Sequence, residues 1–120
     1  TRSDLDVAGG MLVVVRRDGV IEMINRYGAN LLGYTEQDLI GTNWFELIIP
    51  AHVRERRMHA FEQMISGMLD VEGRVYRGQV LCRDGTEKSI RWRNTLLRED
   101  CGSVAGVVSS GEIIPERKKE

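Results

Sequence analysis

Two Asp-Gly dipeptides, each lying between apolar segments, do most to limit the folds open to this chain. Asp18-Gly19 separates the apolar residues 11–15 from residues 20–24, and Asp84-Gly85 separates two longer strand-like segments. An Asp-Gly pair in such a setting is the strongest short-range signal of an antiparallel hairpin. The chain is therefore predicted to begin and to end in antiparallel β-structure.

Three strands are predicted in the second half of the chain, over residues 71–82, 87–98 and 104–113. The turns between them contain Gly85 and Gly102. In the middle strand the residues Ile90, Trp92, Asn94 and Leu96 alternate with Arg91, Arg93 and Thr95. Successive side chains of a strand point to opposite faces, so one face of this sheet is expected to be packed and the other solvated.

Residues 25–49 are predicted to form three short helices. Asn25 is an N-cap for the first, which Gly33 ends, and Thr35 caps the second, with Asp38 in the capping-box position and Gly41 at its end. The third covers residues 43–49 and is closed by a proline. Helices this short depend on tertiary packing more than on their own propensity.

One long helix is predicted over residues 51–67. Its apolar stripe consists of Val53, Ala60, Phe61, Met64 and Met68. All predicted helices thus fall between the second and third of five antiparallel strands. The fold class is therefore α+β, with helices covering one face of the sheet and space for a small ligand between the two layers.

Length and composition favour one soluble domain. The chain has 120 residues, 42% hydrophobic and 29% charged, which is enough for one core. A formal net charge of -1 gives no field for nucleic acid or an anionic membrane, and the longest apolar run, residues 11–15, is too short to cross a bilayer. The polar start does not fit a signal peptide, and the lack of an initial Met suggests a segment of a longer protein.

The cysteines and serines give no evidence of a catalytic or metal site. Cys82 and Cys101 are isolated, which indicates a cytosolic, zinc-free protein. Ser109-Ser110 has no nearby histidine, so the domain itself is not expected to be an enzyme. The arginines predicted on the outer sheet face, Arg74, Arg77, Arg91 and Arg93, lack the aromatic residues of a nucleic-acid platform.

A family resemblance rests on short motifs in a fixed order. They are Arg17-Asp18-Gly19, Ile24-Asn25-Arg26, Leu32-Gly33-Tyr34, the run from Leu39 to Phe45, Ile49-Pro50, Arg83-Asp84-Gly85, the run from Ile90 to Asn94, and Gly106 to Gly111. In this order, over roughly residues 5–120, the chain resembles the PAS (Per-Arnt-Sim) family in its bacterial sensor form with a PAC segment. The resemblance implies a five-stranded antiparallel sheet of order 2-1-5-4-3.

The resemblance also implies a domain plan and a role. Residues 1–10 would be a flanking segment, residues 11–113 the PAS/PAC domain and residues 114–120 the start of an outgoing helix. The exit differs from the family motif, with Ile113 in place of Asp and Pro115 in place of Thr. Family members are sensors and dimerisation modules linked to histidine kinases of two-component systems, diguanylate cyclases or transcription regulators.

Flavin and haem are two cofactors that the resemblance raises. The light-oxygen-voltage subfamily carries a reactive cysteine where this chain has Trp44, so cysteine-based photochemistry is excluded, while flavin binding without an adduct stays open. The family's sheet amides would fall at Val80, Ile90 and Gly111, which have none. The haem-ligand position holds Arg57, and His59 lies two residues further, about 200° round a helix. We therefore treat His59 as a weak haem candidate and leave the cofactor unassigned.

A small carboxylate or other metabolite is the third kind of ligand. Arg57 can read a carboxylate through two hydrogen bonds if it faces the cavity, or it can pair on the surface with Glu46 or Glu55. The candidate pocket residues are Asn43, Trp44, Arg57, Phe61, Val80, Ile90, Trp92, Asn94 and Gly111. Two hypotheses follow: a ligand-responsive cytoplasmic sensor, and a ligandless module that forms a homodimer and has a core filled by side chains.

Overall fold

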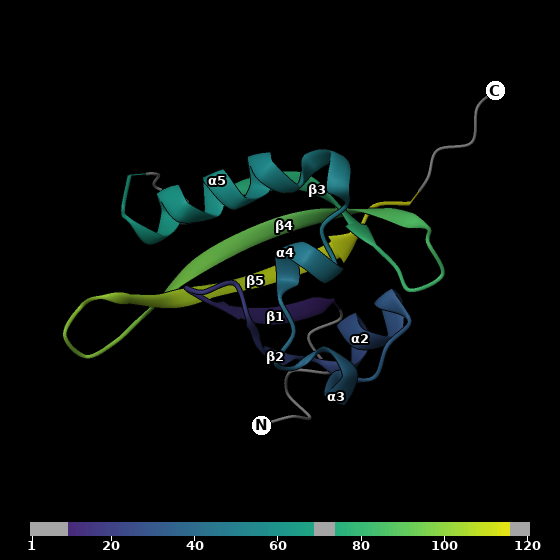
Figure 1. The fold of residues 1–120 in the computed structure, drawn as a ribbon, viewed down its shortest axis with the longest axis horizontal. Coiled ribbons are helices and arrows are strands. Elements are labelled where there is room, and N and C mark those ends of the chain that lie inside the picture. Colours follow the sequence, from purple (N-terminus) through teal and green to yellow (C-terminus); the bar gives the residue numbers. More distant parts are fainter. Residues whose placement is uncertain (1–9, 69–73, 116–120) are drawn as a thin grey trace.

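The computed structural model describes residues 10–68 and 74–115 and shows one antiparallel sheet with helices on one side (Figure 1). The strands are β1 Met11–Arg16, β2 Ile21–Ile24, β3 Val75–Leu81, β4 Glu87–Arg98 and β5 Val104–Ile113. Their order across the sheet is β2-β1-β5-β4-β3. The fold class and the strand order expected from the sequence are both confirmed. The predicted strand 71–82 is described only from Val75, since residues 71–73 lie outside the described residues.

The helices follow one another between β2 and β3, as predicted. They are α2 Arg26–Leu32, α3 Glu36–Leu39, α4 Trp44–Leu47, the 3-10 turn η1 Ala51–Val53, and α5 Arg54–Ile65. In Figure 1, α5 lies along the β3–β4 side of the sheet, while α2 and α3 lie beside β1 and β2. The helical layer therefore covers one face from end to end, with α4 in the middle.

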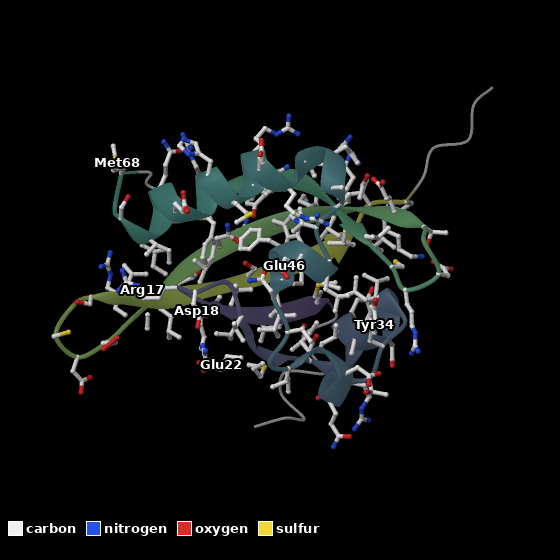
Figure 2. The ribbon with its side chains drawn as sticks, viewed as in Figure 1. Arg17, Asp18, Glu22, Tyr34, Glu46 and Met68 are labelled. Atoms are coloured by element: carbon white, nitrogen blue, oxygen red, sulfur yellow. The ribbon has the colours of Figure 1, made fainter. Side chains whose placement is uncertain are left out.

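The long helix is shorter than its prediction over residues 51–67. Its first turn is 3-10, and the α-helix ends at Ile65, before Gly67 with φ of +83°. Phe61 and Met64 are buried as expected, but the assignment of Met68 to the same apolar stripe is wrong. Met68 is 79% exposed, because the helix has already ended there and its side chain no longer faces the sheet (Figure 2).

Alternation along β4 confirms the predicted two-faced sheet. Ile90, Trp92 and Asn94 are buried beneath the helices, whereas Arg91 and Arg93 between them are exposed. On β1, Met11, Val13 and Val15 contribute to the core, although Val14 on the other face is also buried. Because successive side chains of a strand point to opposite faces and helices cover only one face, these residues of β4 and β1 lie in the core.

Side-chain caps start the three short helices. Asn25 and Asn43 cap α2 and α4, and Thr35 and Asp38 form a complete capping box at α3. Gly33 ends α2 with φ of +88°, a conformation that costs glycine least. The helix boundaries read from these residues are therefore confirmed, within the one or two residues by which helix ends normally vary.

Asn25 does more than cap a helix. Its Oδ1 accepts hydrogen bonds from Gly28 N and from Leu12 N, both at 3.0 Å, and its Nδ2 donates to Gly10 O at 2.8 Å. The side chain is 3% exposed. One buried amide therefore joins the chain before β1, β1 itself and the start of α2.

The described chain ends two residues after β5. Ile114 N donates to Ser89 O at 2.9 Å, which extends the β4–β5 pairing by one hydrogen bond. Residues 114 and 115 are not helical. The rest of the outgoing helix predicted over residues 114–120 lies outside the described residues, as does most of the flanking segment 1–10.

The three-way contact of Asn25 gives a stability prediction. Asn25→Ala should lower the free energy of unfolding by about 2–3 kcal/mol, because it leaves buried backbone donors without an acceptor in addition to removing a cap. Urea denaturation followed by circular dichroism measures the loss. Thr35→Ala, which removes the exposed cap of α3, is the matched control and should cost about 1 kcal/mol. Equal losses in the two variants would contradict the linking role of Asn25.

Candidate ligand cavity

A cavity of about 310 Å³ lies between α5 and the covered face of the sheet. Three groups of residues line it. Helical residues are Trp44, Phe45, Arg57, Ala60, Phe61 and Met64; strand residues are Val15, Val75, Tyr76, Gly78, Gln79, Trp92, Asn94, Val107 and Ser109; and Ile49 after α4 and Arg74 before β3 lie in connecting segments. Exposed Arg74 and Val75 and half-buried Arg57 mark the side that opens to solvent, between α5 and the edge strand β3.

Four aromatic rings form the inner part of the wall in two perpendicular pairs. The rings of Trp44 and Trp92 lie 5.8 Å apart with an interplanar angle of 81°, and those of Phe45 and Phe61 lie 5.0 Å apart at 64°. Edge-to-face pairs of this kind are favourable beyond the area they bury. The first pair joins α4 to β4 and the second joins α4 to α5. The rings therefore line the cavity and also fix these elements relative to one another.

A closed hydrogen-bond network supplies the polar floor of the cavity. Asn94, 2% exposed, accepts from Ser109 Oγ at 2.8 Å through Oδ1. Its Nδ2 donates to Tyr76 OH at 3.0 Å and contacts Met64 Sδ at 3.5 Å. Burial raises the pKa of the Tyr76 phenol, so its hydroxyl keeps its proton at neutral pH. Both polar ends of the Asn94 amide are thus satisfied within the protein.

Arg57 lies across the open side of the cavity. Its Nη2 donates to Arg77 O on β3 at 2.9 Å, and its Cζ lies 5.3 Å from the centre of the Tyr76 ring. The surface alternative, an ion pair with Glu46 or Glu55, is absent from the described residues. Arg57 therefore connects α5 to the edge strand and presents its guanidinium to the cavity.

Of the nine candidate pocket residues, five line this cavity: Trp44, Arg57, Phe61, Trp92 and Asn94. The structure does not bring the other four into its wall. Asn43 is used as the α4 cap, accepting from Phe45 N at 2.9 Å and Glu46 N at 3.1 Å. Val80 and Ile90 are fully buried in the core.

Gly111 gives room to the core and not to the cavity. A Cβ at this position would lie 2.5 Å from Ile90 Cγ2 and 2.8 Å from Trp92 Cζ3. Such distances are far below van der Waals contact. The missing side chain at Gly111 therefore leaves the room that the Trp92 ring occupies beside β5.

Several wall residues were not named from the sequence, although strand register could have found some of them. Tyr76 pairs with Trp92 across β3 and β4, and Ser109 pairs with Asn94 across β4 and β5. Counting back from the turn at Gly85 gives the first pairing. The second also depends on the register shift between Leu97 and Arg98, which counting from the turn at Gly102 does not give. Met64 was placed in the core stripe, but its contact with Asn94 depends on where α5 lies over the sheet, which no local pattern indicates.

The histidines and cysteines lie away from the cavity. His59 is exposed, and His52 makes a contact of 3.0 Å with Glu87. Cys82 is buried and donates to Leu31 O, whereas Cys101 is exposed in the β4–β5 turn. Among the described residues no cluster of three His, Cys, Asp or Glu side chains could hold a metal ion. No helix in that part of the chain has the length and hydropathy needed to cross a membrane.

Comparisons with known proteins agree on the fold. A family model described as the PAS fold matches residues 5–119. A PAS domain from Colwellia psychrerythraea superposes with a TM-score of 0.82 at 18% identity, covering 97% of this chain and 96% of that one. The RpfR quorum-sensing receptor PAS domain of Cronobacter turicensis, in complex with BDSF, gives 0.70 at 22% identity over 90% and 96%.

A third structure is longer than this chain. The Vibrio cholerae VqmA dimer gives a TM-score of 0.73 at 18% identity, covering 96% of this chain but 52% of that one. No curated protein matches the sequence. At these identities the solved structures establish a shared fold, while the family model covers nearly the whole chain.

Substitution of Gly111 tests how the cavity wall is supported. Gly111→Ala should lower the free energy of unfolding by about 1–3 kcal/mol, because the added methyl group overlaps Ile90 and Trp92. It should also change the near-ultraviolet circular dichroism that arises from the two tryptophans. Ser110→Ala, an exposed neighbour, is the control and should leave both measurements unchanged. An unaltered tryptophan signal in Gly111→Ala would show that Trp92 does not depend on this close approach.

Proposed function

The chain belongs to the PAS family, and we propose that it is the sensor domain of a bacterial signal-transduction protein that binds a small, largely apolar molecule in the cavity under α5. The parent protein is proposed to be a sensor histidine kinase or a diguanylate cyclase located in the cytoplasm. One observation carries the ligand-binding part of the proposal. It is the cavity of about 310 Å³ between the helices and the sheet.

The size and chemistry of the cavity support a small ligand. Ligand pockets begin at roughly 300 Å³ and are mostly apolar, with a few polar groups that fix orientation. Here four aromatic rings supply the apolar part, and Arg57, Tyr76 and Trp92 supply polar atoms. The similar RpfR domain was crystallised in complex with BDSF, which supports the same use of the fold.

The cavity wall is also connected through strand pairing to β5, the strand that leads to the C-terminal end of the domain. Trp92 and Asn94 on β4 pair directly with Gly111 and Ser109 on β5. Five residues beyond Ser109 comes Ile114, the last residue bonded to β4. A ligand that displaces Trp92 would thus press on the strand that leads out of the domain. We propose that occupancy is relayed in this way to a C-terminal output domain, as a shift between two states.

A ligandless dimerisation module is the second candidate function. The outer face of the sheet favours it, since no described helix covers that face and it carries apolar side chains. Val75 and Leu97 are 48% and 37% exposed there, and Leu12 is half-buried. The similar VqmA is described as a dimer. A homodimer through this face is compatible with the sensor function. It would also give the domain a role as an interaction module if no ligand binds.

Native mass spectrometry of the purified domain tests the sensor proposal. We expect a persistent mass above that of the chain, or a mass increase on exposure to a library of small apolar molecules. A bare dimer that takes up nothing would favour the second candidate function.

A cavity-filling variant makes this test specific. Ala60 lies in the cavity wall, and its neighbour His59 is exposed. Ala60→Phe should occupy the space and abolish the added mass, whereas His59→Phe should retain it. Retention in Ala60→Phe would mean that any bound molecule lies elsewhere.

A further inference from the structure

The open side of the cavity presents hydrogen-bond donors that have no acceptor among the described residues. The Arg57 guanidinium carries five N–H donors, and among the described residues it has one acceptor, Arg77 O. The side chain is half-buried, so water reaches it only in part. Arg57 lines the cavity at its open side, so its remaining donors are available to solvent or to a bound molecule.

Trp92 contributes a second donor at the same place. The residue is 4% exposed, and its Nε1–H has no acceptor within the described part of the chain. No fully buried side-chain nitrogen or oxygen of the described residues lacks a partner, so this N–H opens onto the cavity space. A Cβ built on Gly78 would lie 3.3 Å from Trp92 Nε1 and 3.2 Å from Arg57 Nη2. Because Gly78 has no side chain, the two donors border one space.

Among the described residues, no negative charge pairs with these donors. The described residues of the cavity wall include two arginines, Arg57 and Arg74, and no Asp or Glu. Neither guanidinium is in an ion pair with a described residue. The amide network around Asn94 is closed on itself, since Asn94 bonds to Tyr76 and Ser109. Donors that open onto an apolar cavity are matched by a ligand that brings only acceptors, so such a ligand has the complementary chemistry.

We propose that the ligand class is an amphipathic monocarboxylate, with its carboxylate over Gly78 between Arg57 and Trp92 and its apolar chain among the aromatic rings. The proposal rests on the sensor function above and specifies its ligand. A carboxylate accepts at both oxygens and pairs with a planar guanidinium through two parallel bonds. The volume of about 310 Å³ admits a chain of medium length and excludes large headgroups.

Matched acid and alcohol probes test the head group. Isothermal titration calorimetry compares decanoate with 1-decanol, which has the same chain without the anionic group, on protein shown by native mass spectrometry to be free of ligand. We expect decanoate to bind at least about tenfold more tightly, since a hydrogen-bonded charge pair contributes that much. Arg57→Gln should remove this difference and leave 1-decanol binding unchanged.

Two further variants control for misfolding and position. Arg56→Gln removes an exposed arginine next in sequence that is not in the wall, and it should bind decanoate as the wild type does. Gly78→Ala keeps both donors but places a methyl group between them, and it should weaken decanoate binding at least about fivefold while 1-decanol binding persists. Thermal unfolding of each variant confirms that the fold is intact.

The outcomes separate this proposal from the sensor function. Equal binding of decanoate and 1-decanol, unchanged by Arg57→Gln, would overturn the carboxylate class and leave the sensor function standing. The same holds if neither probe binds while the domain retains an unrelated molecule in native mass spectrometry. If no added mass is found and neither probe binds, both proposals fail.

Discussion

The fold depends on side-chain hydrogen bonds that hold a chain of short helices against one face of the sheet. α2, α3 and α4 are too short to persist alone in water. Each begins at a side-chain cap, and Asn25 ties the first to β1 from a buried position. These short helices therefore cover the β1–β2 part of the sheet, although no long helix lies between β2 and α4. The other face is left to solvent, which explains the arginines at alternate positions of β4.

The same constraint leaves space under α5. The N-terminal end of this helix is fastened closely, since Arg54 donates to the carbonyl oxygens of Phe45, Glu46 and Ile49 and so covers the end of α4. Leu81 N also donates to Ile48 O at 2.7 Å, which holds the end of β3 to the same segment. Further along α5 the only hydrogen bond to the edge strand comes, within the described residues, from Arg57. The helix is therefore close to the sheet at one end and separated by a cavity along its length.

Local patterns predicted the elements well, because their causes are local. Asp-Gly turns, capping residues and the alternation along β4 each involve residues close in sequence, and all were confirmed. Met68 shows the limit, since a helical period alone does not indicate where the helix ends. The cavity wall was predicted in part for a related reason. Trp44, Phe61, Trp92 and Asn94 are large or polar side chains on inward faces, and an inward face can be read from the sequence.

The remaining wall residues needed distances that no sequence pattern supplies. Val80 and Ile90 also point inward, yet they are covered by packed side chains, and only the depth of the core distinguishes them from Trp92. Gly78 and Gly111 are both strand glycines that look alike in the sequence. The structure separates their roles, because Gly111 makes room for Trp92 while Gly78 borders two donors. Which inward residue faces the cavity is thus decided by tertiary packing.

Some polar groups of the cavity have hydrogen-bond partners within the described residues and others do not, and the two kinds contribute differently to stability and to ligand binding. Asn94, Ser109 and Tyr76 satisfy one another, as buried polar groups nearly always do, so their hydrogen bonds contribute to folding. Trp92 Nε1 and most of the Arg57 guanidinium lack such partners in the described chain. Because these donors are not fully buried, water can solvate them in the empty domain, and a ligand that supplies acceptors can replace that water. Stability and recognition are therefore carried largely by different atoms of one cavity wall. Trp92 contributes to both through its ring and its N–H, and Arg57 contributes to both through its bond to Arg77 O and its remaining donors.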